Sequence, residues 1–360
     1  MTSPVSWEVA ERVAVRVAGR DPFEHSYHYA SLQPDFDELT AEAEELVAEA
    51  TGLRSLSGPA RARVTDRAGW VRANLASFRR LLRPLTDRLG ERLDAAGRSP
   101  LTAAARTVTG AELGTMLGWM STRVLGQYDL LLVEDEDPDD QDLVYYVGPN
   151  VIALEKRFAF PPREFRLWLA LHEVTHRAQF TGVPWLRPYF LGLVDQGLTG
   201  IDPDPRRFLN ALRRAADELR KGRNPLAEGG IVALLAGPEQ RAVLQQIQGL
   251  MSLLEGHGDV TMDRAAIDRV PSADRFSRVL RERRSTVSAP ARLLQQFIGL
   301  EAKLKQYEQG ERFIHAIETR GGPALLNQVW DDPANLPTLD EIRDPAEWVT
   351  RVTTQAATTR

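Results

Sequence analysis

Apolar residues recur at three-to-four spacing along most of the chain, a period typical of amphipathic or buried helices. The N-terminal part predicts helices over 35–51, 66–89 and 103–126, which we interpret as a packed bundle. Further helices are expected at 162–180, 205–222, 230–235, 238–263, 274–284 and 289–320. The last forty residues, from Gly321, are punctuated by proline and are expected to wrap the surface. The pattern therefore predicts a protein that is largely helical.

The pattern changes between residues 128 and 156. Tyr128–Val133 is a short apolar run, and an acidic loop follows at Glu134–Asp142. Leu143–Val147 and Asn150–Glu155 are then predicted as two strands separated by a glycine and a proline. We expect an α+β fold, mostly α-helical, with one small β-sheet. Its regions would be a helical N-terminal part (1–126), a catalytic part (127–350) and a tail (351–360).

Composition narrows the class of protein and its location. The 360 residues carry a net charge of −5, which gives no general argument for nucleic-acid binding. Cysteine is absent, which excludes disulfides and thiolate metal sites. Glu8 and Glu11 interrupt the apolar residues near the N-terminus, so we expect no signal peptide. No apolar stretch approaches the roughly 18 residues of a membrane span. We expect a cytoplasmic protein without membrane or nucleic-acid partners, from a GC-rich bacterium because nearly all its cations are arginine.

His172, Glu173 and His176 form an HExxH motif within the helical segment EFRLWLALHEVTHRAQF. Residues four apart lie on one helix face, so both imidazoles can bind one zinc ion. Glu173 is then placed to take a proton from a zinc-bound water. The apolar residues around the motif indicate a buried helix, where ionisable groups without a function would be costly. The motif predicts a catalytic zinc site, one ion per chain.

A catalytic zinc site needs a third protein ligand, and the helix at 238–263 offers one. Every fourth residue of this helix forms a row in which three apolar residues are followed by Glu255 and Asp259. A carboxylate on a buried stripe needs a cation, so Glu255 is the favoured ligand and Asp259 could orient a zinc-bound histidine. His257, on a different face, is the alternative ligand. Gly256 and Gly258 lie in the middle of this helix, which is tolerable if its backbone must pass close to another element.

Three stretches, LHEVTHRAQF, GLMSLLEGHGDVTMD and LEAKLKQYEQGERFIHAI, resemble the zincin-like metallopeptidase type 2 family of actinobacteria and their relatives. HExxH followed by ExxxD also resembles the gluzincin arrangement, although His176 and Glu255 are 79 positions apart, which requires a helical insertion. The resemblance implies a zincin core and a metallopeptidase. Tyr307, in the third stretch, could donate to the oxyanion of a tetrahedral intermediate, or it could pack against a neighbouring helix.

Together these observations predict a zinc-dependent hydrolase that cleaves the amide bond of a peptide or small amide, with Glu173 as general base. Three alternatives stay open. The chain could be a zinc-binding scaffold without catalytic activity, or it could hydrolyse a non-peptide amide metabolite. It could also be a helical protein that binds DNA or a partner and carries the motif by chance.

Overall fold

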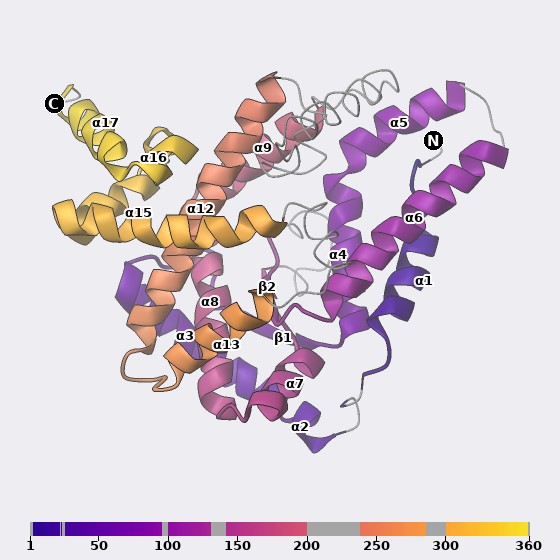
Figure 1. Ribbon diagram of the computed structural model, residues 1–360, viewed down its shortest axis with the longest axis horizontal. Helices are drawn as coiled ribbons and strands as arrows, with labels where there is room; N and C mark the ends of the chain where they lie inside the picture. The colour runs from indigo at the N-terminus through magenta and orange to yellow at the C-terminus, as the bar shows by residue number, and fades with distance from the viewer. Residues whose placement is uncertain are drawn as a thin grey trace. The chain divides into compact units, whose positions relative to one another are not determined.

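A computed structural model (Figure 1) describes residues 3–21, 23, 26–95, 100–130, 142–199, 238–285 and 300–358. By packing, the chain divides into two compact units. The first comprises Met1–Gly182 and Arg264–Phe276, and the second comprises Val183–Asp263 and Ser277–Arg360. The boundaries of these units differ from those of the regions proposed from the sequence, 1–126, 127–350 and 351–360. The functional division into those regions stays a prediction.

Most of the first unit is helical, as the pattern of apolar residues predicts. Its helices are α1 (Trp7–Ala18), α2 (Tyr27–Ala30), α3 (Leu32–Thr51), α4 (Arg67–Leu81), α5 (Arg83–Ala95), α6 (Pro100–Ser121), α7 (Gly148–Phe158) and α8 (Pro162–Gly182). The side chain of Asp66 caps α4 by accepting from the Gly69 N–H, and Gly52 ends α3 in the left-handed conformation at φ 74°. The single helix predicted over 66–89 is wrong, because α4 ends at Leu81 and α5 begins just before Pro84. Proline lacks the N–H that a continuous helix would use there.

A three-stranded sheet lies within this unit, in the order β1 (Arg61–Thr65), β3 (Leu143–Val147), β2 (Gly126–Tyr128). β1 pairs with β3 in parallel, with Arg61 opposite Leu143, and β2 pairs with β3 antiparallel, with Gln127 opposite Tyr145. All five residues of β3 are buried, as is usual for a central strand with both faces covered. The prediction of β3 is confirmed, whereas β1 was not predicted.

Helices cover both faces of the sheet. On one face, Tyr146 stacks on Phe36 of α3 and its hydroxyl lies 2.8 Å from that of Thr40. On the other face, Val147 joins a core cluster with α1, α4 and α6, which includes Trp70 and Leu117. α8 packs along α3 and contacts β2 and β3. The sheet therefore lies between a layer of α3 and α8 and a layer that begins with α4.

The strand predicted at Asn150–Glu155 is wrong, because these residues lie in helix α7. Pro149 occupies the first turn of α7, where its missing N–H costs nothing. Buried residues run from Gly148 to Ile152 without a gap, so the segment shows no period that separates a strand from a buried helix. The sheet is consequently smaller than the predicted region 128–156.

The N-terminal half of α8 is held by aromatic side chains. Phe165 and Trp168 of α8 pack against Phe276, and Phe160 joins them at 4.7 Å between ring centroids from Phe276. Phe276 belongs to the Arg264–Phe276 segment of the same unit. Edge-to-face pairs of this kind add directional packing to the area that they bury. They fix the helix that carries the HExxH motif.

The described part of the second unit is helical. Its elements are α9 (Leu186–Thr199), most of α12 (Pro238–Ala266) and α13 (Ala273–Ser285), α15 (Leu300–Asn327), the 3-10 turns η2 (Gln328–Trp330) and η3 (Pro333–Asn335), α16 (Leu339–Arg343) and α17 (Pro345–Thr358). Gly256 of α12 meets Gly310 of α15 so closely that a Cβ on Gly256 would lie 2.3 Å from the Gly310 carbonyl carbon. A close approach of this kind is the circumstance in which a glycine in the middle of α12 is tolerable.

The C-terminal residues form helices rather than an extended wrap, since α17 runs to Thr358 and includes most of the predicted tail. The helices predicted at 205–222 and 230–235, and the acidic loop, lie outside the described residues. No helix in the described ranges is both long and apolar enough to cross a membrane.

Candidate metal centre

His172 and His176 are the two accessible positions in the long central part of α8. From Phe165 to Thr181, every residue of α8 is buried except these two histidines, which are half-buried. Apolar packing on all sides explains why this segment is a helix in the interior of its unit. The two histidines of the motif therefore share the one face of this stretch that is not fully buried.

The two imidazoles point their Nε2 atoms toward one another, 3.3 Å apart. Two nitrogen ligands on a tetrahedral zinc ion, each about 2.0–2.1 Å from the metal, would be separated by about 3.3–3.4 Å. The ring centroids are 4.7 Å apart and the rings are nearly perpendicular. The spacing of the histidine nitrogens thus fits two ligands of one metal ion.

Gln179 lies beside the second histidine. Its Oε1 is 3.0 Å from Nδ1 of His176, and Gln179 is fully buried at 0% exposure. An amide oxygen only accepts hydrogen bonds, so this contact is a hydrogen bond when the imidazole proton is on Nδ1. In the neutral ring, Nε2 then carries the lone pair that a metal requires.

Glu173 points from α8 to the edge strand β2. Its Oε2 accepts a hydrogen bond of 3.1 Å from the backbone N–H of Tyr128. A Cβ on Gly126 would lie 2.7 Å from Cγ of Glu173, so glycine leaves the space in which this side chain lies. Burial raises the pKa of the Tyr146 hydroxyl, and the nearby charge of Glu173 raises it further. The hydrogen bond from Tyr128 and the space at Gly126 thus fix the position of the Glu173 carboxylate at β2.

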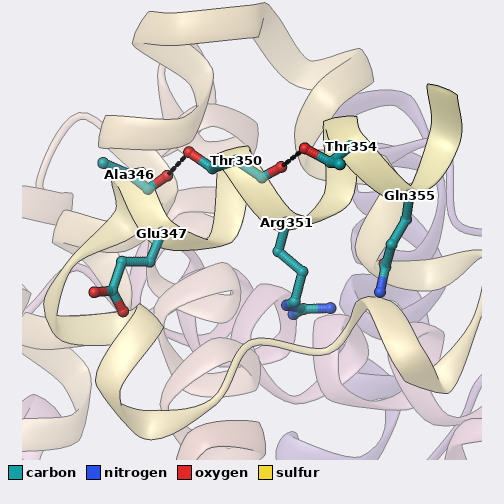
Figure 2. Close-up of a pocket in the computed structure, with 6 residues that line it drawn as sticks. All are labelled: Ala346, Glu347, Thr350, Arg351, Thr354 and Gln355. Carbon is teal, nitrogen blue, oxygen red and sulfur yellow. Dashed lines mark hydrogen bonds between the residues drawn. The ribbon is translucent and has the colours of Figure 1, made fainter. Parts of the chain in front are cut away.

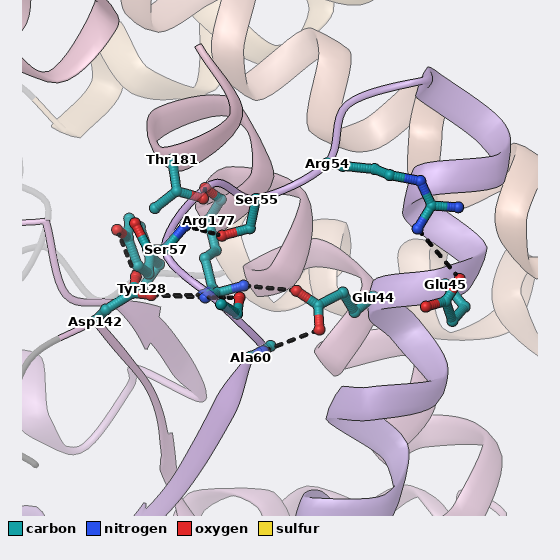
Figure 3. A network of polar contacts seen from close by, with 11 residues as sticks. Glu44, Glu45, Arg54, Ser55, Ser57, Ala60, Tyr128, Asp142, Arg177 and Thr181 are labelled. Carbon is teal, nitrogen blue, oxygen red and sulfur yellow. Dashed lines mark hydrogen bonds and ion pairs between the residues drawn. The ribbon is translucent and has the colours of Figure 1, made fainter. Parts of the chain in front are cut away.

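Arg177 ties the motif helix to three neighbouring segments (Figure 3). It is 1% exposed, and it donates to Oε1 of Glu44 at 2.7 Å, to Oδ2 of Asp142 at 2.6 Å and to the carbonyl of Gly58 at 2.8 Å. Asp142 also accepts from the hydroxyl of Tyr128 at 3.0 Å. The same network therefore contacts both the motif helix and the strand that binds Glu173.

The other predicted ligands lie on α12, in the second unit. Glu255 is 3% exposed and directly follows two buried leucines, and Asp259 is half-buried one turn later. The ring of His257 lies edge-on to Trp330 of the same unit, 5.1 Å between centroids. Glu255 is thus buried, although the apolar residues of its predicted row, Val243, Ile247 and Met251, are only half-buried. His257, also buried, packs against the ring of Trp330.

Tyr307 falls within α15, but its side chain lies outside the described residues, so its predicted role stays a prediction. A hollow of about 570 Å³ lies along α17 and is lined by Ala346, Glu347, Thr350, Arg351, Thr354 and Gln355 (Figure 2). It contains no histidine, and Arg351 is bound to Glu341 at 2.6 Å. The hollow offers no ligand set for a metal.

Sequence reasoning missed Gln179, Gly126 and Tyr128 as parts of this site. Gln179 gave a signal, because it is a polar residue three positions after His176 on a helix predicted to be buried. No sequence signal indicated Gly126 or the Tyr128 amide, because their role depends on the tertiary position of β2 beside α8.

Two comparisons place these observations among known proteins. The family described as zincin-like metallopeptidase matches residues 5–349. A crystal structure from Chloroflexus aurantiacus, described as a candidate hydrolase with a novel fold, is 30% identical to this chain with a TM-score of 0.71. The alignment covers 97% of this chain and 99% of that one. The comparison with curated proteins gives no match.

Proposed function

The chain belongs to the zincin-like metallopeptidase family, and on this premise we propose that it is a zinc-dependent hydrolase of amide bonds. Family membership supports a divalent metal and a hydrolytic reaction. The structurally similar protein from Chloroflexus aurantiacus is itself described as a candidate hydrolase, which agrees with this class. Zinc as the metal, and a peptide as the substrate, are the finer parts of the proposal.

The observation that carries the proposal is the 3.3 Å separation of the histidine Nε2 atoms, within a stretch of α8 whose other residues are buried. Nitrogen ligands favour zinc over calcium or magnesium, which prefer oxygen. A purely structural pair of histidines would not need to present both Nε2 atoms to the same point.

We propose Glu255 as the third ligand. With His172 and His176 it makes a set of two imidazoles and one carboxylate, which is chemically suited to a divalent metal. A buried carboxylate is costly unless a cation or strong hydrogen bonds stabilise it, and Glu255 is almost fully buried. Asp259, one turn further on, would orient a ligand from outside the coordination sphere.

Zinc bound at these residues would polarise the scissile carbonyl and make a water molecule more acidic. Glu173 would take the proton from that water and pass it to the leaving amine. The Tyr128 N–H donates to one carboxylate oxygen, Oε2, so the side chain keeps one orientation toward β2. This orientation is what the hydrogen bond at β2 would contribute to the reaction.

The test begins with elemental analysis of the purified full chain, for which we expect one zinc per chain. His172→Ala and His176→Ala should each abolish stoichiometric zinc. Turnover is then measured on a peptide library and on a panel of small amides. Zinc without turnover on any substrate would support the scaffold alternative, turnover on small amides alone would support the metabolite hydrolase, and absence of zinc would refute the proposal.

A further inference from the structure

We propose that Gln179 is a positioning residue that holds His176 in the tautomer and ring orientation needed for metal binding. The inference rests on the proposed metal site but concerns a residue outside its ligand set. It follows from two contacts that both lie on α8, so it depends on the geometry of one helix.

The first step is the position of Gln179. It follows His176 by three residues, which places both side chains on adjacent turns of the same helix face. Oε1 lies 3.0 Å from Nδ1 of His176, and no part of Gln179 is exposed. Burial keeps water from replacing the amide as hydrogen-bond partner of Nδ1, so the glutamine sets where the ring proton resides.

The second step is the direction of the other nitrogen. With Nδ1 oriented toward Gln179, the opposite side of the ring presents Nε2 toward Nε2 of His172, at the 3.3 Å that fits a shared ion. Rotation of the imidazole by half a turn about its bond to Cβ would break the contact with Gln179. The hydrogen bond thus selects both the protonated nitrogen and the ring orientation.

The third step is the charge of the partner. Metal-binding histidines commonly donate to a carboxylate, a carbonyl or water, and a carboxylate also raises the basicity of the ligand. Gln179 provides the acceptor without adding a negative charge to the buried interior beside Glu173. The site therefore gains orientation while the metal keeps more of its positive charge.

Two variants separate positioning from simple packing. Gln179→Leu keeps the approximate size but removes the acceptor, and Gln179→Glu restores an acceptor. Thr181→Val is the matched control, since it removes a buried hydroxyl from α8 whose hydrogen bond, 2.7 Å to the carbonyl of Arg177, does not involve His176. Zinc affinity is measured by competition with a chromophoric chelator. We expect Gln179→Leu to weaken it by about 10–100-fold, with Gln179→Glu at or above wild type and Thr181→Val unchanged.

The second readout needs no metal. Imidazole ¹⁵N shifts of the metal-free full chain at about pH 8, above the usual histidine pKa of about 6.5, report which nitrogen of His176 is protonated. The signal is assigned by its loss in His176→Ala. We expect a proton on Nδ1 in wild type and in Gln179→Glu, and a mixture of tautomers in Gln179→Leu.

The outcomes distinguish this inference from the proposed function. A wild-type chain that binds no zinc refutes the function, whereas the tautomer measurement still tests Gln179. Protonation on Nε2 in the metal-free wild type overturns the inference, even if Gln179→Leu fails to fold. Unchanged zinc affinity in Gln179→Leu, with Nδ1 still protonated, also overturns it.

Discussion

The backbone N–H of Tyr128 donates a hydrogen bond of 3.1 Å to Oε2 of Glu173. This contact joins the edge strand of the sheet to the helix that carries both histidines. A backbone donor is fixed by strand pairing and cannot rotate away as a side chain can. The position of the proposed general base therefore depends on the sheet as well as on its own helix.

Glu173→Gln should retain zinc and lose activity. The amide has nearly the same shape and can still accept from the Tyr128 N–H, but it cannot take a proton from water. We expect turnover to fall by about 10²–10⁴-fold, the usual contribution of general acid–base catalysis. Zinc content and turnover are measured on the same preparation, and turnover at the wild-type rate would show that another group is the base.

Gly126→Ala should displace Glu173. The new methyl group would lie 2.7 Å from Cγ and 2.8 Å from Oε1 of that side chain, so one of the two must move. We expect lower turnover, retained zinc, and a loss of about 1–3 kcal/mol in the free energy of unfolding from overpacking. Gly192→Ala is the control, because Gly192 lies within α9 with open space where a Cβ would be. That change should be neutral or stabilise by up to about 1 kcal/mol.

Arg177→Met should destabilise the first unit strongly. The side chain is buried, and its removal leaves Glu44 and Asp142 without the cation that they share. Removing one partner from a buried ion pair costs about 3–5 kcal/mol. Arg54→Met provides the comparison in the same region (Figure 3), since Arg54 and Glu45 are 69% and 74% exposed. Such an exposed pair contributes about 0–1 kcal/mol. Equal losses in chemical denaturation would contradict this account.

Glu255→Gln and His257→Gln should differ in zinc affinity. Loss of a ligand should weaken binding by more than the roughly 10–100-fold of a change outside the coordination sphere. We expect this loss for Glu255→Gln, whereas His257→Gln should change mainly the packing against Trp330. The reverse order of affinities, measured by chelator competition, would assign the third ligand to His257.

Stability should fall in acid through Glu341. Burial alone would raise the pKa of this carboxyl, but the hydrogen bonds from Arg351 and from the Thr338 amide outweigh it, so the net pKa is lowered. A lowered pKa in the folded state means that the contribution is present above the unfolded pKa, about 4.3 for glutamate, and is lost as pH falls through the folded value. Glu341→Gln should therefore cost about 1–3 kcal/mol near neutral pH, and the difference from wild type should shrink in acid.

Much of the fold followed from the spacing of apolar residues. The period of α3 is long and regular, α8 is too long an apolar segment for a strand, and β3 is a short apolar run between turn residues, so these elements were predicted correctly. α7 was not, because an apolar segment buried on every side has no period to identify it. β1 was missed because Arg61–Thr65 contains two arginines and pairs only with a strand far along the chain.

The candidate site divides in the same way. His172, Glu173 and His176 are close in sequence, so helix geometry alone brings them together. Gln179 obeys the same rule and could have been inferred from its spacing. The Tyr128 amide and the space at Gly126 arise from tertiary packing, which no local pattern records.

The parallel pairing of β1 with β3 has a consequence for how the protein folds. It closes a loop over residues 66–142, which includes β2 and therefore the donor to Glu173. Closing a long loop costs chain entropy before its contacts compensate, and contacts distant in sequence slow folding. The helix with both histidines can form early, from local contacts, whereas the general base acquires its partner only when the distant strands have met. We therefore expect refolding chains to recover helical circular dichroism before they recover hydrolytic activity.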